Sequence, residues 1–225
     1  MTPIAVRETS ARRSGAPHWR FARFIKATLG RLLLGIYRVR LTGWENVPVD
    51  GAILAGNHVS YLDPALLWSA TPRPIRFVAK TELWEPRLLG WALDHLWAFP
   101  VKRGSADREM ISAATALLES SELVGMFPEG TRKRGTDSDE LGAAHGGVAF
   151  LAIRAGVPVV PVGIAGTDQA LPAGARMPRF PRVTIVVGRP IHPSGFEGGR
   201  KERTEAMTAA IMEAIAVSRG RARGE

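Results

Sequence analysis

Short apolar runs alternate with helix-like segments along most of this 225-residue chain, and this alternation limits the fold more than any other feature. Strands are predicted over residues 39–42, 52–55, 75–79, 96–101, 123–127, 157–164 and 183–187. Helices are predicted over residues 82–95, 107–119, 146–155 and 201–218. The pattern indicates an α/β fold with a mixed, largely parallel sheet flanked by helices.

Two of the apolar runs lead into polar turns. The first turn, residues 57–64, reads Asn-His-Val-Ser-Tyr-Leu-Asp-Pro. Ligands of α/β proteins bind beyond the carboxyl ends of strands, so His58 stands where a base would act on a bound hydroxyl group. Asp63, five residues later, can return to the ring and fix its tautomer. In the alternative interpretation, Asp63 only caps a helix that starts at Pro64.

The second turn, residues 127–132, reads Phe-Pro-Glu-Gly-Thr-Arg. Gly130 allows a ligand to approach the backbone closely, and Arg132 suits a phosphate group. Glu129 can accept a hydrogen bond from a substrate hydroxyl group. A solvated turn capped by Thr131 is the alternative interpretation.

Two further segments carry weaker signals. Lys102 and Arg103 directly follow the run at 96–101 and form either an anion site or an ordinary surface pair. Residues 157–162, Val-Pro-Val-Val-Pro-Val, predict an edge strand or a bend, because proline cannot donate to a sheet. We interpret this segment as architecture that forms one wall of the site.

The positive charge is concentrated at the amino end. Of the 30 lysines and arginines, nine lie in residues 1–40 beside a single acid, so this segment carries +8 of the formal net charge of +9. Residues 1–16 are predicted to be a disordered basic arm, and residues 17–38 a basic amphipathic helix. The apolar face of the helix either contacts an anionic membrane or docks on the protein core. This face comprises Phe21, Ile25, Leu29, Leu32, Leu33 and Ile36.

The remaining composition narrows the function classes. No run of roughly 18 uncharged apolar residues is present, so no transmembrane helix is predicted. The absence of cysteine excludes disulfides, cysteine-ligated metals and a cysteine nucleophile. Residues 39–218 are predicted to form the α/β domain and residues 219–225 a frayed basic tail. A nucleic-acid-binding protein would also explain the basic arm, but no nucleic-acid motif is present.

Together these segments resemble the glycerolipid acyltransferase family, in particular the 1-acylglycerol-3-phosphate acyltransferases. His58 and Asp63 match the first block, His-x-x-x-x-Asp, and Arg103 matches the arginine of the second. Residues 127–132 and 157–162 match the third and fourth blocks. The first block alone is a weak signal, whereas four blocks in order are a specific one. Lys102, a second cation beside Arg103, departs from the pattern.

The resemblance implies roles for these residues. His58 would be the general base and Asp63 the carboxylate that orients it. The reaction would move a fatty acyl group from acyl-coenzyme A or acyl carrier protein to the sn-2 hydroxyl of lysophosphatidic acid, giving phosphatidic acid. The glycerol-phosphate end of the acceptor would be bound by Arg103, Glu129, Gly130, Thr131 and Arg132, with Lys80 and Lys102 as weaker candidates.

The resemblance also implies partners and location. A thioester is already activated, so no metal and no cofactor beyond the acyl co-substrate is expected. The expected partners are lysophosphatidic acid, the acyl thioester, its carrier protein where one is used, and an anionic membrane surface, without nucleic acid. The expected location is the cytoplasmic face of the cell membrane, as a peripheral protein. The alternatives are the same chemistry on another lysophospholipid or a polar alcohol, and a basic membrane- or nucleic-acid-binding protein without activity.

Overall fold

The computed structural model describes residues 22–87, 90, 91, 93, 98–101, 108–129, 146–170 and 179–225. Within them the strands form a seven-stranded sheet in the order β1-β7-β6-β2-β5-β3-β4. Neighbouring strands are parallel except for β6 and β7, which are antiparallel. The predicted mixed, largely parallel α/β fold is therefore confirmed. The strands are β1 (Arg40–Thr42), β2 (Ala52–Gly56), β3 (Ile75–Lys80), β4 (Phe99–Val101), β5 (Leu123–Met126), β6 (Val159–Ala165) and β7 (Thr184–Val187).

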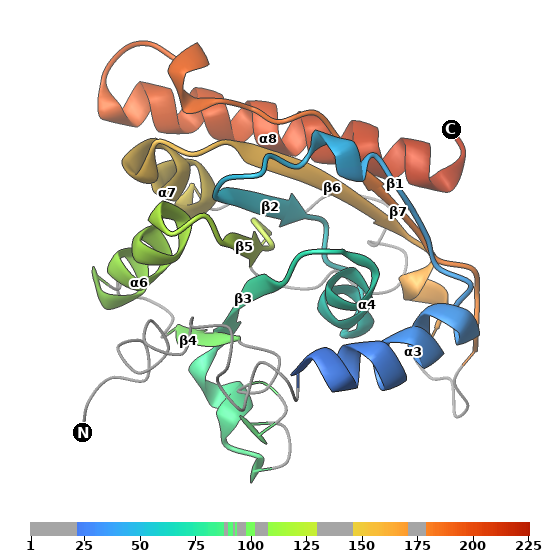
Figure 1. Ribbon diagram of the computed structural model, residues 1–225. Helices are drawn as coiled ribbons and strands as arrows, with labels where there is room; N and C mark the ends of the chain where they lie inside the picture. Colours follow the sequence, from blue (N-terminus) through green and yellow to red (C-terminus); the bar gives the residue numbers. More distant parts are fainter. Residues whose placement is uncertain are drawn as a thin grey trace.

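Helices cover both faces of the sheet (Figure 1). The amino-terminal helix and α4 lie on one face, and α6, α7 and α8 lie on the other. Short 3-10 turns connect these elements at η3 (Trp44–Asn46), η4 (Thr81–Trp84), η6 (Thr167–Gln169) and η7 (Pro193–Gly195). The longer helical elements are the π-helical η2 (Lys26–Gly30), α3 (Arg31–Ile36), α4 (Leu62–Ala70), α6 (Arg108–Glu119), α7 (Gly147–Ala155) and α8 (Arg200–Arg223).

Strand β2 contributes to both hydrophobic cores, because all of its residues are buried. Ala52 and Leu54 face the core beneath α4, whereas Ile53 and Ala55 face the core beneath α6, α7 and α8. A parallel strand that is buried on both faces has an uninterrupted apolar sequence. Strands β5 and β6 flank β2 in parallel, so the carboxyl ends of all three meet at one edge of the sheet.

Of the two alternatives predicted for residues 157–162, an edge strand or a bend, the edge strand is wrong, because Pro161 lies in β6, between β7 and β2. The sheet accommodates the proline by a break in the pairing on the β7 side. On that side, Val162 pairs with Val187, and Val159 forms an isolated bridge with Ile191. Between these two pairings, the Pro161 carbonyl oxygen accepts a hydrogen bond from the Gly188 N–H. The missing N–H therefore costs no ladder hydrogen bond.

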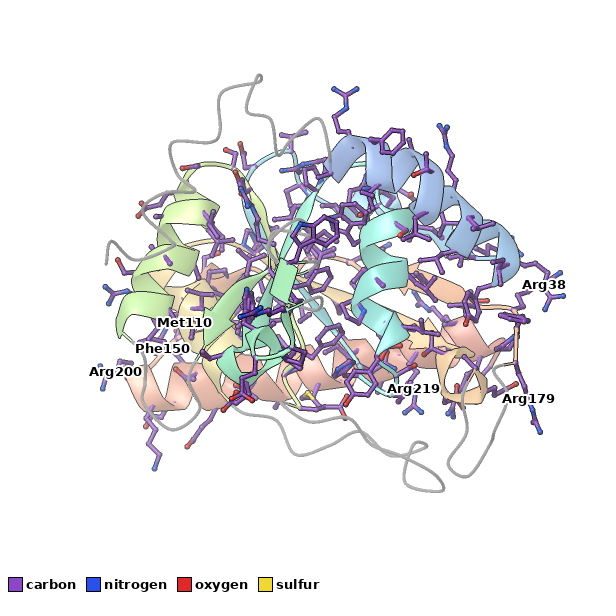
Figure 2. All side chains as sticks on the ribbon, turned by 90° about the horizontal axis from the view of Figure 1, so that it is seen from below. Arg38, Met110, Phe150, Arg179, Arg200 and Arg219 are labelled. Atoms are coloured by element: carbon purple, nitrogen blue, oxygen red, sulfur yellow. The ribbon has the colours of Figure 1, made fainter. Side chains whose placement is uncertain are left out.

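The carboxyl-terminal segment is ordered helix, which corrects the prediction of a frayed tail at residues 219–225. Helix α8 continues to Arg223, and both Arg219 and Ala222 are buried. Gly163 of β6 permits this close packing. A Cβ atom at this position would lie 2.2 Å from the Arg219 backbone nitrogen and would clash with it. Figure 2 labels Arg219 on this helix.

The predicted amino-terminal helix is present from residue 22 to Ile36. Residues 1–21 lie outside the described part of the chain, so the basic arm stays a prediction. Among the helices that the structure describes, none has both the length and the apolar character needed to cross a membrane.

Candidate active site

The turn after β2 is fixed to strand β6 by a buried amide. Asn57 donates from Nδ2 to the Ile164 carbonyl oxygen over 3.0 Å, and its Oδ1 accepts from the Ile164 N–H over 2.7 Å. The side chain thus bridges β2 and β6 just beyond Gly56, where β2 ends. Because both groups are satisfied where water is excluded, the amide fixes the point at which the chain leaves the sheet.

The next residue, His58, pairs with Asp63 as the spacing predicts. His58 Nδ1 lies 2.9 Å from Asp63 Oδ2, and the Asp63 side chain is fully buried while 17% of the His58 side chain is exposed. A carboxylate only accepts, so this contact places the proton on Nδ1 and leaves Nε2 as the accepting nitrogen. No described residue bonds to Nε2, which is therefore available to a ligand hydroxyl group.

The Asp63 carboxylate organises the whole turn. Besides His58, its Oδ2 accepts from the backbone N–H groups of Val59 and Ser60, over 2.8 and 2.7 Å. Helix α4 begins at Leu62, before Asp63, and its N-cap residue is Tyr61, which makes no side-chain cap bond. The capping interpretation is therefore wrong: Asp63 lies inside the first turn and binds the preceding loop.

The turn after β5 supports His58 from another side. The buried Glu129 accepts the His58 backbone N–H at its Oε1 over 3.2 Å. The ring of Phe127 stacks on the imidazole, with centroids 4.2 Å apart and planes inclined by 19°. Phe77 stacks behind Phe127 at 5.9 Å. Both the backbone and the ring of His58 are therefore held by residues about 70 positions away in the sequence.

Thr167 is a site residue that the sequence motifs did not indicate. Its hydroxyl donates to Asp63 Oδ1 over 2.5 Å, and the residue is almost fully buried. It follows β6 directly after Gly166, whose positive φ of 96° turns the chain back toward the site. The signal that could have identified it is its place just beyond a parallel strand, as for His58 and Glu129.

For the other predicted substrate-binding residues, the structure describes only the backbone of Lys80. Lys80 is the last residue of β3, but its side chain lies outside the described part of the structure. The remaining five also lie outside the described residues, so their roles stay predictions: Lys102, Arg103, Gly130, Thr131 and Arg132.

The amino-terminal helix carries an outward apolar stripe. Figure 2 labels Arg38 just beyond the end of this helix. Phe24 belongs to the stripe although it was not predicted. Ile25 and Leu33 are half-buried. Leu33 packs against the core, so it does not belong to the outward face on which it was predicted. Phe21 lies outside the described residues. The stripe consists of Phe24, Leu29, Leu32 and Ile36, which are 61, 50, 59 and 37% exposed.

Comparison with known proteins decides the family. The profile of the family described as Acyltransferase matches residues 38–165, more than half of the chain. The chain belongs to the acyltransferase family. The matched region of this acyltransferase contains His58, Asp63 and Glu129 and ends two residues before Thr167.

Individual relatives of this acyltransferase differ in the acceptor that they are named for. The 1-acyl-sn-glycerol-3-phosphate acyltransferase of Bacillus subtilis is 31% identical over 180 residues, which is 79% of this chain and 86% of that protein. The chloroplastic LPAT1 of Arabidopsis thaliana is 30% identical over 163 residues, or 70% of this chain and 45% of that one. The chain therefore spans about half the length of the plant relative. A lyso-ornithine lipid O-acyltransferase of Pseudomonas aeruginosa is 32% identical over 146 residues, 64% of this chain and 54% of that one.

The fold is shared with a solved structure. The 1-acyl-sn-glycerophosphate (LPA) acyltransferase PlsC of Thermotoga maritima superposes with a TM-score of 0.73 and 21% sequence identity. The superposition covers 98% of this chain and 88% of the Thermotoga chain. The acyltransferase and the Thermotoga protein therefore share one fold. The predicted family is confirmed by these comparisons.

Proposed function

We propose that this acyltransferase moves a fatty acyl group from an acyl thioester to the sn-2 hydroxyl of lysophosphatidic acid, giving phosphatidic acid. The observation that carries the proposal is the pair of His58 Nδ1 and Asp63 Oδ2, 2.9 Å apart at the edge where β2, β5 and β6 end. The names of the Bacillus and Arabidopsis relatives support 1-acyl-sn-glycerol-3-phosphate as the acceptor.

In this mechanism His58 is the general base. Its Nε2 takes the proton of the sn-2 hydroxyl while the hydroxyl oxygen attacks the thioester carbonyl carbon. Asp63 holds the ring in the required tautomer and stabilises the imidazolium ion. When the carbon–sulfur bond breaks, His58 returns the proton to the leaving sulfur. A thioester is activated enough for direct transfer, so the proposal includes no metal, no cofactor and no acyl-enzyme.

The proposal assigns the acceptor phosphate to residues that match the family blocks. One oxygen of Glu129 is already engaged by the catalytic turn, because its Oε1 accepts the His58 N–H. We assign to Glu129 the support of the catalytic turn. The resemblance alone supports phosphate binding by Arg103, Gly130, Thr131 and Arg132, with weaker contributions from Lys80 and Lys102.

The test compares the wild-type enzyme with a His58→Ala variant. With long-chain acyl-coenzyme A and lysophosphatidic acid, the variant should lose about 10²- to 10⁴-fold in kcat, because the general base is gone. Positional analysis of the product identifies the acylated hydroxyl group. His192→Ala, at the start of η7, is the matched control and should retain activity. Full activity in His58→Ala would contradict the mechanism.

A second acceptor class is favoured by one relative. The similarity to a lyso-ornithine lipid O-acyltransferase makes a lysolipid without a phosphate monoester the second candidate acceptor. Competing the two lysolipids in one assay separates the candidates by the ratio of their kcat/KM values. A preference for the lyso-ornithine lipid would replace the acceptor while leaving the roles of His58 and Asp63 intact.

Peripheral membrane binding also belongs to the proposal. Both lipids partition into bilayers, and the outward stripe of Phe24, Leu29, Leu32 and Ile36 offers an apolar contact. We place the enzyme at the cytoplasmic face, where acyl-coenzyme A or acyl carrier protein would deliver the acyl group. Flotation with vesicles tests the membrane contact. Replacing Phe24 and Leu32 by serine should abolish flotation with neutral and anionic vesicles alike.

A further inference from the structure

A cavity whose lining includes cationic residues lies away from the catalytic turn, between the amino-terminal helix and the carboxyl-terminal end of α4. Its volume is about 460 Å³. Arg23, Lys26 and Arg31 line it from the amino-terminal helix, and Trp68, Pro72 and Pro74 line it from α4 and the following loop. Among the described residues, the wall therefore contains three cationic side chains and no acidic one.

Lys26 is the central cation of this cavity. Its Nζ donates to the Thr71 carbonyl over 2.5 Å and lies 5.1 Å from the centre of the Trp68 ring. Burial lowers the pKa of Lys26 to about 8. Within the described part of the structure no acidic residue lines the cavity, and the hydrogen-bond partner of Lys26 is a carbonyl oxygen, not a carboxylate. A half-buried cation without a carboxylate disfavours folding, and a bound anion would offset that cost.

Trp68 contributes its aromatic ring to the same wall, and the Lys26 ammonium group lies over that ring. The residue is 4% exposed, and its Nε1 is buried with no hydrogen-bond partner in the described part of the structure. Lys26 and Trp68 both line the cavity.

The cavity is distinct from the catalytic site because the two use opposite ends of α4. Asp63 lies in the first turn of this nine-residue helix, whereas Trp68 and Ser69 lie in its last turn. At 1.5 Å per residue the helix separates the two ends by about 10 Å. No residue of the His58–Asp63 pair lines the cavity.

The position of the cavity beside the outward stripe indicates what binds there. Arg23 and Arg31 belong to the same helix turns as Phe24 and Leu32, which are 61 and 59% exposed. A helix that inserts its apolar stripe at the acyl boundary holds neighbouring cations at the level of the lipid headgroups. Cations at that level attract anionic lipids.

We propose that this cavity binds the phosphate headgroup of an anionic membrane phospholipid. The inference rests on the proposed membrane contact and adds a discrete headgroup site to it. The phosphate oxygens accept from Lys26 and Arg31, and the lipid chains continue along the apolar stripe. Occupied in this way, the cavity orients the enzyme on the bilayer independently of the acceptor that His58 uses.

The test measures binding of the full chain to vesicles of phosphatidylcholine with and without phosphatidylglycerol, whose phosphodiester does not titrate near neutral pH. Because Lys26 loses its proton above pH about 8, affinity for the anionic vesicles should fall by about 10-fold or more between pH 7 and 9.5. A Lys26→Arg variant keeps its charge and should show no such fall. Lys26→Met should bind weakly at every pH.

Matched variants separate a discrete site from diffuse attraction. Arg31→Gln should weaken binding to anionic vesicles by more than 10-fold, because it removes a lining cation. Arg40→Gln removes the same charge from an exposed residue of β1 outside the cavity, and should cost about 5-fold or less. Circular dichroism of each variant establishes that it is folded.

Three outcomes would overturn the inference, and they differ in what they leave standing. If the wild-type protein fails to float with either kind of vesicle, the proposed membrane contact is overturned as well. Flotation that is insensitive to pH, and equal in Arg31→Gln and Arg40→Gln, removes only the headgroup site. Weaker binding of coenzyme A by Lys26→Met, with unchanged vesicle binding, assigns the cavity to a soluble phosphate ligand instead.

Discussion

The two ends of helix α4 hold opposite charges in opposite ways. At the amino end, the buried Asp63 carboxylate accepts hydrogen bonds from two backbone N–H groups, from His58 and from Thr167. At the carboxyl end, Lys26 donates to the Thr71 carbonyl and faces a cavity with two more cationic residues. Both charges suit the helix dipole, yet only the carboxylate is fully surrounded by partners.

This difference separates a site built for chemistry from one built for binding. A general base needs a fixed geometry before the substrate arrives, so its supporting carboxylate is saturated by protein groups. A binding cavity keeps part of its polar capacity for the ligand. The same short helix therefore connects a rigid reaction centre to a cationic cavity whose counter-charge we expect from the membrane.

The largest expected effect concerns Asp63→Asn. The amide oxygen can still accept from His58, Val59 and Ser60, and the amide nitrogen can turn toward Thr167, so the turn keeps its shape. The negative charge that stabilises the imidazolium is lost, and kcat should fall by about 10²-fold or more. Steady-state kinetics measure the fall, with circular dichroism as the check on folding. Near wild-type kcat in the folded variant would reduce Asp63 to a structural residue of the turn.

A smaller effect is expected for Thr167→Val, which removes the donor to Asp63 Oδ1. A lost hydrogen bond to a charged group is worth about 1.5–3 kcal/mol, so activity at neutral pH should fall by about 10-fold or more. The carboxylate then attracts the protonated imidazole more strongly, and the acid limb of the pH–rate profile moves to higher pH.

The conservative change Thr167→Ser serves as the control, because it keeps the hydroxyl group and should restore both the rate and the position of the limb. A loss of activity without movement of the limb in Thr167→Val would show that Thr167 only fills space beside Asp63.

The smallest expected effect concerns stability at the other end of α4. Above pH about 8 the folded chain has released the Lys26 proton that the unfolded chain keeps up to about 10.5, so stability rises with pH over this window. Between pH 7 and 10, the free energy of unfolding of the wild type should rise by about 1 kcal/mol more than that of Lys26→Met. The rise is kept to this size because solvent screens a half-buried residue. Urea unfolding at several pH values measures it.

Lys201→Met is the matched control for this prediction, because the Lys201 side chain is 88% exposed and should not change the pH dependence. Parallel stability curves for the wild type and Lys26→Met would mean that Lys26 is hydrated, and would weaken the contrast between the two ends of the helix.

Much of the site was predictable from local sequence. A strand buried on both faces produces an uninterrupted apolar run, so the strand at 52–55 and the turn beginning at Asn57 could be located together. The spacing of His58 and Asp63 allowed their pairing, since five residues form a single turn, and the match to the four family blocks favoured the pairing over a helix cap. Thr167 was not predictable in this way, because its contact with Asp63 joins residues 104 positions apart.

The sequence by itself determined the order of strands and helices, the residue types at the strand ends and the basic amino-terminal segment, because these depend on near neighbours along the chain. The tertiary structure decided which strand ends meet, since the order β6-β2-β5 brings Thr167, His58 and Glu129 to one edge. It also decided which face of the amino-terminal helix is covered. Packing on α4 buries part of that face and turns Phe24 and Leu32 outward, an outcome that helical periodicity alone does not specify.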